Sequence, residues 1–280
     1  MPVDLTPILP YVPVWLMILF RLTGIFVLAP VLGSSSIPRT VKVFLALGLS
    51  FAIWPMLWID PEASGSLAVA VQNLDLWSLG LLVALELLIG YVIGYAASLP
   101  LTGMQLGGHI IDQQMGLAVA EQYNPEIDGQ AGVAGQLLFW LALALFIAAG
   151  GLNVMLHTLA QTFRHVPLGG FASFDQIVTM VVGMITIMFE LGLRVAAPLL
   201  CLMFLISVGM GFLMRTVPTF NILSVGFSIR ILSSLIVMMM LIGAIAGAYG
   251  EMTGQILGEL MRFFDAEPPP PPGPRGIPQG

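Results

Sequence analysis

The sequence predicts an all-α membrane protein, and two observations lead to this fold class. Of the 280 residues, 58% are hydrophobic and only 9% are charged, whereas a soluble domain carries about 25% charged residues. The apolar residues also form continuous runs, as membrane helices require, and do not alternate as the strands of a membrane barrel do. We therefore expect about six long hydrophobic helices, arranged in hairpins and in contact with membrane lipid.

Three hydrophobic blocks fill the first part of the chain. They cover residues 12–32, 43–59 and 76–99. A Gly/Ser-rich turn separates the first two, and an acidic linker that contains Pro61 separates the second and third. Since about 20 apolar residues suffice to cross a bilayer, each block is expected to form one helix.

The second part of the chain holds a block of 136–159, a longer one of 177–213 and a last one that begins at residue 220. The block of 177–213 is too long for one span and contains charges and a proline, so we expect two helices that meet near Arg194 and Pro198. The last block continues beyond residue 249 as an amphipathic segment to residue 264.

The chain divides into a helical domain of residues 1–264 and a tail of residues 265–280. The tail contains five consecutive prolines followed by a Gly-Pro-Arg-Gly sequence. Such a composition favours an extended segment without a packed core. We expect a disordered tail on the cytoplasmic side of the membrane.

Several function classes are disfavoured by composition and by missing motifs. The 9 Lys and Arg residues, a net charge of -6 and the absence of a basic run argue against a nucleic-acid binder. The sequence carries no zinc-protease, serine-hydrolase or phosphate-loop motif. Cys201 has no partner for a disulfide and reads as a small core residue, and three scattered histidines make a poor metal site. A non-enzymatic protein without metal or cofactor is expected.

Four charged residues inside apolar blocks are candidate functional residues, because each such charge costs about 2.5–3.5 kcal/mol on insertion scales. They are Arg21, Glu86, Glu190 and Arg194. Glu190 and Arg194 are four residues apart, which favours an ion pair along one helix. Arg21 and Glu86 would compensate each other only if their helices were neighbours, which the sequence leaves open.

The least hydrophobic long stretch inside the helical domain begins with residues 103–116. Polar, glycine-rich backbone at membrane depth is tolerated only where protein buries it or a cavity borders it. The stretch is therefore either a loop outside the membrane or a re-entrant segment that lines a pore. The candidate residues are Gly103, Met104, Gln105, Gly107, Asp112, Gln114, Met115 and Gly116, followed by Asn124 and Pro125.

Glycines four residues apart form three short ladders. The pairs are Gly90 with Gly94, Gly243 with Gly247, and Gly254 with Gly258. Small residues at this spacing let helices approach closely. The ladders indicate either packing within the chain or contact with neighbouring subunits.

Motifs along nearly the whole chain carry a family resemblance. The stretch of 103–116 and the Tyr123-Asn124-Pro125 sequence after it are the strongest of them. In their order and spacing these motifs resemble the FliR family, the R component of type III export gates. The scattered positions that share the resemblance are Arg21, Pro30, Gly33, Pro38, Lys42, Glu86, Gly90, Gly94, Pro198, Gly211, Arg215, Pro218 and Asn221.

Three positions depart from the family pattern. Thr219 follows Pro218 where the family often has Gln, and Ser207 stands where an acid is common. Phe227 occupies a position where proline is expected. These departures concern the local contacts of the last hairpin.

The resemblance implies a subunit of the flagellar protein-export gate in the bacterial inner membrane, at the flagellar basal body. FliR-like proteins assemble with FliP-like and FliQ-like subunits into a helical channel for unfolded flagellar proteins, while FlhB-like and FlhA-like proteins surround it. The segment after the third block then corresponds to the family's channel plug, at about residues 103–125.

The sequence also allows two alternative functions. The first is the homologous gate subunit of a virulence injectisome, which uses the same mechanism for other cargo. The second is an ion-coupled secondary transporter that uses Glu86, Glu190 and Arg194. Such transporters often contain inverted repeats, and no clear repeat is visible in this sequence.

Overall fold

The computed structural model describes residues 12–34, 36–57, 75–116, 132–165, 174–216 and 222–265. Every regular element in this part of the chain is a helix, which confirms the predicted all-α fold. The helices are α1 (Val12–Leu28), α2 (Arg39–Leu57), α4 (Leu76–Met115), α6 (Val133–Ala148), α7 (Gly151–His165), α8 (Phe174–Thr216), α9 (Ile222–Met240) and α10 (Ile242–Asp265).

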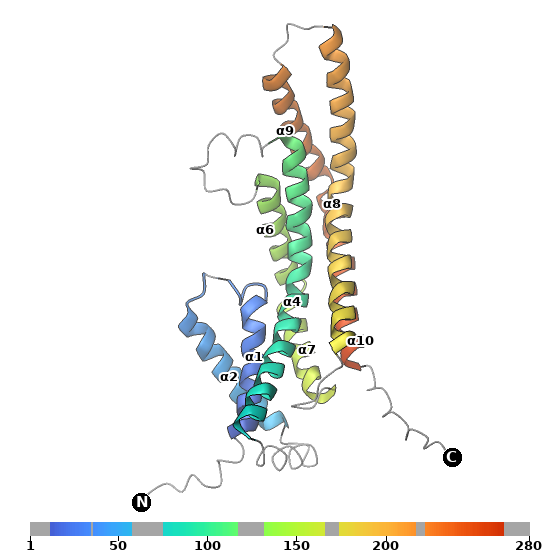
Figure 1. Cartoon of the computed structure of the whole chain (residues 1–280). Helices are drawn as coiled ribbons and strands as arrows, with labels where there is room; N and C mark the ends of the chain where they lie inside the picture. The colour runs from blue at the N-terminus through green and yellow to red at the C-terminus, as the bar shows by residue number, and fades with distance from the viewer. Residues whose placement is uncertain are drawn as a thin grey trace, which may run out of the picture.

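Two long helices, α4 and α8, run side by side and form the axis of the molecule (Figure 1). Helix α1 lies against the lower half of α4, and α2 packs on α1. Helices α6 and α7 cover another side of α4. Helix α9 accompanies the upper part of α8, and α10 returns along its lower part. The apolar core therefore follows α4, which contacts α1, α6, α8 and α10.

The lengths of α4 and α8 exceed what one bilayer needs. They contain 40 and 43 residues, which at 1.5 Å per residue corresponds to about 60 Å and 65 Å. The hydrocarbon core is about 30 Å thick, so a 60 Å helix would fit inside it only at a tilt of about 60°, beyond the usual 0–40°. Both helices therefore extend past the hydrocarbon region.

Two helices of the described chain, Trp77–Met115 within α4 and Ile177–Thr216 within α8, are long and apolar enough to span a membrane. The number rises to four if each of two bent helix pairs counts as one span. The pair α6 and α7 is bent by 63°, and the pair α9 and α10 by 62°. The prediction of about six long hydrophobic helices is therefore approximate in number, since two to four candidate spans are found in the described part of the chain.

The predicted break of the long block near Pro198 is wrong, because α8 continues through it. Proline removes one backbone donor and usually bends a helix. The residues around it, Val195, Ala196 and Leu199, are fully or nearly fully buried in the core, while Pro198 itself faces outward. Packing on one side of α8 thus keeps the helix continuous where local propensity alone predicts an end.

The predicted hydrophobic block of 136–159 contains two helices, because the chain turns between α6 and α7. Gly150 adopts a φ of 72° at this turn, in the left-handed region that glycine reaches without strain. The last block likewise bends between α9 and α10 instead of continuing straight.

The first glycine ladder packs inside the chain. A Cβ atom at Gly90 would overlap the carbonyl oxygen of Arg21, and one at Gly94 would lie 2.8 Å from the carbonyl oxygen of Ile25. On the facing helix, a Cβ atom at Gly24 would overlap the carbonyl oxygen of Leu87. Helices α1 and α4 therefore touch backbone to backbone, as small residues at helix crossings permit.

The ladders of α10 differ. Added Cβ atoms at Gly243, Gly247, Gly254 and Gly258 meet no described atom within 4 Å. These glycines lie on a side of α10 that the described part of the chain leaves open. Of the two interpretations of the ladders, packing within the chain therefore holds for Gly90 and Gly94 alone.

This contrast gives a matched test of the α1–α4 crossing. Gly90→Ala is expected to lower the free energy of unfolding by roughly 1–3 kcal/mol, because the new methyl group forces two backbones apart. Gly247→Ala is the control and should raise stability by up to about 1 kcal/mol, since alanine favours helices more than glycine. Thermal unfolding of the purified full chain in detergent measures both, and equal shifts would contradict the packing described here.

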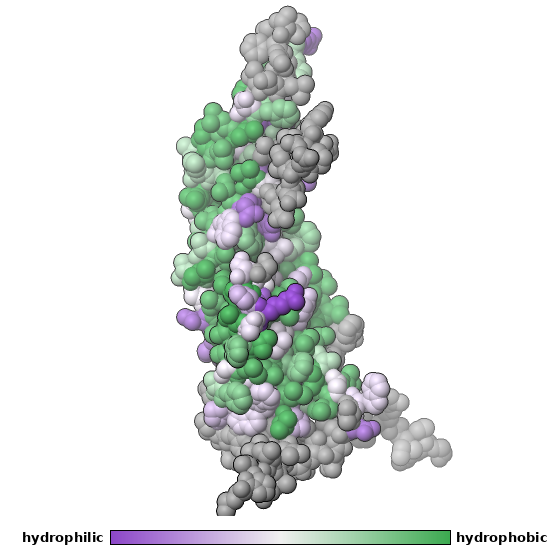
Figure 2. All heavy atoms as spheres, turned by 90° about the vertical axis from the view of Figure 1, so that its left-hand side faces the viewer, coloured by the Kyte–Doolittle hydropathy of each residue, from purple (hydrophilic) through white to green (hydrophobic). Residues whose placement is uncertain are grey.

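Much of the outer surface is apolar. Figure 2 shows hydrophobic residues over most of one face of the molecule. On α8 the side chains of Phe189, Phe204 and Phe212 are 51%, 68% and 69% exposed. Contiguous apolar surface of this kind marks contact with lipid or with other proteins.

Candidate functional site

The stretch singled out by its glycines and polar residues forms the C-terminal part of α4. Residues 103–115 are helical, so the expectation of an irregular loop is wrong for them. A Cβ atom at Gly103 would lie 2.8 Å from the carbonyl oxygen of Met188, and one at Gly107 would lie 2.8 Å from that of Gly192. These glycines, four residues apart, bring α4 close to α8 and do not interrupt it.

On another side of α4, Gly108 lies against α6. A Cβ atom there would overlap the backbone of Gly135. Glycines therefore serve two different crossings within one helical stretch, because 103 and 107 share a face and 108 lies about 100° away from 107.

Asp112 links the end of α4 to the beginning of α6. Its carboxylate accepts hydrogen bonds from the backbone N–H groups of Ala134 and Gly135, each at 2.9 Å. The N-cap residue of α6 is Gly132, which has no side chain to accept them, and a Cβ atom there would overlap the Asp112 carboxyl group. Asp112 is only 5% exposed, and it performs the capping role that a local Ser or Asp usually performs.

The cap therefore holds together the two ends of the segment of residues 117–131. This segment lies outside the described residues, and so do the predicted site residues Asn124 and Pro125. What the structure defines is the base from which the segment leaves and to which it returns.

The end of α4 is closed by Gly116, whose φ of 83° places it in the left-handed region and whose N–H donates to the carbonyl oxygen of Gln113. The ring of Phe227, on α9, lies directly beside it, where a Cβ atom would overlap. A glycine C-cap is the usual way to end a helix, and here the neighbouring ring excludes any larger residue.

Arg230 of α9 joins three helices near this end. One guanidinium nitrogen donates to the hydroxyl oxygen of Ser207 on α8 at 3.0 Å, and the other to the carbonyl oxygen of Gln114 at 3.5 Å. Cations near the C-terminus of a helix interact favourably with its dipole. Sequence reasoning missed Arg230, although it is the one charged residue within α9 and the rule for charges in apolar blocks would have identified it.

The remaining predicted residues of this stretch divide by burial. Met104 and Met115 are 0% and 2% exposed, so they fill the helix-packing core. Gln105 is half-buried, and Gln114 is exposed. Within the described chain, the polar surface of the stretch therefore gathers at its last turn.

A second cluster lies at the crossing of α1, α4 and α7. Arg21 and Glu86 are 0% and 1% exposed, and Arg21 Nε donates to Glu86 Oε2 at 2.5 Å. Arg21 also donates to the Thr162 hydroxyl at 3.4 Å, and its guanidinium lies 4.4 Å from the centre of the Phe163 ring. The two charges thus compensate each other across helices, the arrangement that the sequence left open.

The expected pair of Glu190 with Arg194 is wrong. Arg194 instead pairs with Glu251 of α10 at 2.9 Å, with the two side chains 49% and 53% exposed. Glu190 is exposed on α8. Side chains four residues apart can meet on a helix, but a partner on a neighbouring helix, 57 positions away, competes for the same cation.

Hydrogen bonds connect the family-motif residues at the turn between α1 and α2. Lys42 Nζ donates to the carbonyl oxygen of Gly33 at 3.0 Å, and the Pro38 carbonyl accepts from the N–H groups of the first turn of α2. Between Pro30 and Gly33, Val31 adopts a φ of 68°, which is costly for a β-branched residue. Arg215 is exposed near the end of α8, while Pro218 and Asn221 lie outside the described residues.

Two sequence expectations concern metal binding and the single cysteine. The described residues contain no group of three His, Cys, Asp or Glu side chains placed to hold a metal ion. Cys201 is exposed on α8, so its interpretation as a core residue is wrong.

Comparison with known proteins decides the family. Residues 12–256 match the model for bacterial export proteins, family 1. The chain belongs to this family. The resemblance to FliR proteins predicted from the sequence is thereby confirmed, and with its long apolar helices this export protein is a membrane protein.

Individual relatives cover most of the chain. A flagellar biosynthetic protein FliR from Escherichia coli (strain K12) is 28% identical over 89% of this chain and 92% of its own length. One from Bacillus subtilis (strain 168) is 23% identical over 83% and 87%. A Yop proteins translocation protein T from Yersinia pestis is 27% identical over 80% and 82%.

Proposed function

We propose that this export-family protein is a non-enzymatic subunit of the flagellar type III protein-export gate. In this proposal it assembles with FliP-like and FliQ-like subunits into the core channel for unfolded flagellar proteins, with FlhB-like and FlhA-like proteins around it. The gate lies in the inner membrane at the flagellar basal body, and the tail of this chain faces the cytoplasm. The observation that carries the proposal is the similarity to flagellar relatives along almost the whole chain.

The shape of the molecule supports assembly with other subunits. Helices of about 60 Å cannot be enclosed by a hydrocarbon core of about 30 Å, yet α8 exposes large apolar side chains near both its ends, such as Val182 and Phe212. Lipid covers part of such a surface, and neighbouring subunits cover the rest. The open glycine ladders of α10 offer further backbone surface for close helix contact.

The channel plug is proposed for the segment that follows α4. Gly103, Met104 and Gly107 are then supporting residues, because they fix α4 against its neighbours. Asp112 fixes the base of the plug through its cap on α6. Gln114, Met115 and Gly116 form the transition into the plug, and Asn124 and Pro125 belong to it.

The injectisome gate remains the second candidate, because the Yersinia protein named for Yop translocation covers nearly as much of the chain at similar identity. The mechanism is the same in both candidates and the cargo differs. The helix packing described above serves either cargo equally.

The secreted-protein profile of a host strain that lacks this gene distinguishes these functions. Loss of hook and filament proteins from the medium, restored by a plasmid copy, is the expected result. Loss of effector proteins with an intact flagellar profile would favour the injectisome. If no secreted protein changed, the export proposal would be overturned and an ion-coupled transporter would take its place.

A further inference from the structure

A cavity of about 440 Å³ opens between α1 and α2, at the end of the molecule opposite to α9 (Figure 1). Its walls are mostly aliphatic, and Thr23 supplies the hydroxyl among them. That hydroxyl donates to the carbonyl oxygen of Leu19 at 2.7 Å, so it is already satisfied. The volume lies within the range of ligand sites, and the walls suit a hydrocarbon chain.

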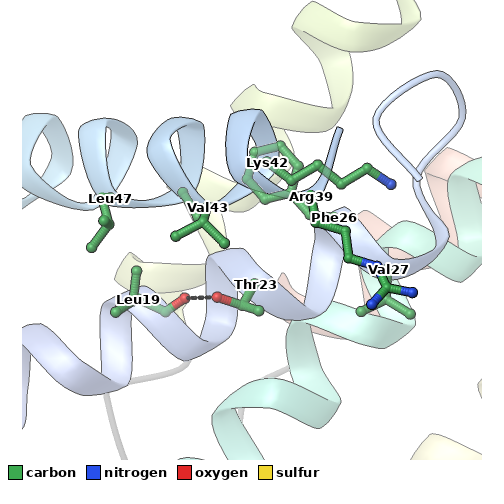
Figure 3. A pocket seen from close by; sticks show the side chains of 9 residues that line it. Leu19, Thr23, Phe26, Val27, Arg39, Lys42, Val43 and Leu47 are labelled. Carbon is green, nitrogen blue, oxygen red and sulfur yellow. Dashed lines mark hydrogen bonds between the residues drawn. The ribbon is translucent and has the colours of Figure 1, made fainter. Parts of the chain in front are cut away.

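Two cations lie together at one end of this cavity. Figure 3 shows Arg39 and Lys42 of α2 at one end, while Leu19 and Leu47 form the other. Among the described residues that line the cavity there is no Asp or Glu. The cavity is therefore amphipathic, with a positive entrance and an apolar interior.

The position of one of the cations is fixed by the turn before α2. Lys42 Nζ donates to the Gly33 carbonyl, and this turn is itself held by hydrogen bonds from Leu32 to Pro30 and from Gly33 to Ala29. An ammonium group has three donors, so two remain after this bond. They are available to an anion beside the Arg39 guanidinium, which binds phosphate oxygens in a fork.

The length of the cavity fits one membrane leaflet. From Arg39 to Leu47 the helix rises by about 12 Å, at 1.5 Å per residue. One leaflet contributes about half of the 30 Å hydrocarbon core, or about 15 Å. A lipid whose headgroup reached Arg39 and Lys42 would therefore place most of one acyl chain along the cavity.

We propose that the α1–α2 cavity binds an anionic glycerophospholipid, with its phosphate on Arg39 and Lys42 and one acyl chain between Thr23, Ala46 and Leu47. The charge of the entrance selects an anionic headgroup, and the depth of the apolar part selects a chain-bearing ligand over a free phosphate. This inference is independent of the cargo of the export gate.

The test uses the purified full chain in detergent, titrated with dioleoyl phosphatidylglycerol or dioleoyl phosphatidylcholine and followed by native mass spectrometry. We expect roughly 25-fold tighter binding of phosphatidylglycerol, from about a factor of five for each of two basic residues near an anionic lipid. The double variant Arg39→Gln/Lys42→Gln should lose this preference. The matched control, Arg215→Gln/Arg262→Gln, removes two exposed cations elsewhere and should keep it.

A third variant and a second ligand test the acyl chain. Val43→Trp replaces a small aliphatic side chain by a large ring at an exposed position in the cavity lining. This variant should weaken the binding of both lipids alike. Inorganic phosphate at the same concentrations should leave phosphatidylglycerol bound. Three outcomes would each overturn the proposal. They are equal binding of the two lipids by the unmodified chain, loss of the phosphatidylglycerol preference in the Arg215→Gln/Arg262→Gln control, and displacement of phosphatidylglycerol by inorganic phosphate.

Discussion

Replacing Glu86 by leucine is expected to lower the free energy of unfolding by about 3–5 kcal/mol. The reason is that Arg21, which is 0% exposed, then keeps its charge in the core without the carboxylate that balances it. The hydroxyl of Thr162 and the ring of Phe163 stay in place but carry no full negative charge. Since total stabilities are only 5–15 kcal/mol, such a loss should be visible as a lower thermal midpoint and a lower amount of protein in the membrane.

Two further variants separate burial from pairing. Arg21→Met/Glu86→Leu removes both charges together and should recover most of the loss, because apolar residues of similar size replace buried pairs at little cost. Glu251→Leu breaks the exposed pair with Arg194 and should cost at most about 1 kcal/mol. If Glu86→Leu and Glu251→Leu lowered the free energy of unfolding equally, the buried cluster would contribute no more to stability than the exposed pair, against this prediction.

Replacing Asp112 by asparagine is expected to make the membrane permeable to small solutes when the assembled gate is overproduced. An amide accepts at one atom only, so one of the two N–H groups at the start of α6 loses its partner. The loss of such a cap costs about 1–2 kcal/mol, which raises the population of the uncapped state roughly 5- to 30-fold. Because the cap fixes the base of the proposed plug, we expect faster entry of a small dye together with weaker secretion.

The matched control for this prediction is Asp75→Asn. Asp75 is the N-cap residue of α4 but its side chain makes no capping hydrogen bond. The same chemical change there should leave permeability and secretion unchanged. A tight membrane in the Asp112→Asn strain, with normal amounts of assembled gate, would contradict the proposed role of the cap in the plug.

The positions of the hydrophobic helices were predictable because a run of apolar residues is a local signal. The starts of α1 and α4 coincide with those of the predicted blocks at residues 12 and 76. Continuity was less predictable, because it depends on neighbours. Pro198 suggests an end of the helix locally, yet burial of Val195 and Leu199 maintains α8 through it.

Polar stretches were misread for the same reason. The glycines at 103, 107 and 108 are typical of a loop when only the local chain is considered. In the structure each one faces another helix, and the identity of that helix is not encoded in the spacing. Likewise, the partner of Arg194 is 57 positions away, and the capping groups of Asp112 are 22 and 23 positions away.

Residues near α9 show what a wider search of the sequence would have found. Arg230 is a single cation in an apolar helix, and such residues deserve the same treatment as Arg21 and Glu86. Ser207 and Phe227 were noted only as departures from the family pattern. Both contact the end of α4 or the arginine that reaches it, so these two departures occur around one shared junction.

The mismatch between helix length and bilayer thickness has a consequence for how cells handle this protein. A newly made copy that has not met its neighbours presents apolar side chains of α8, such as Phe204 and Phe212, to water or to headgroups. Exposed surface of this kind drives aggregation and attracts the proteases that remove unassembled proteins. Synthesis in step with its neighbours therefore protects the protein, and surplus copies should be short-lived.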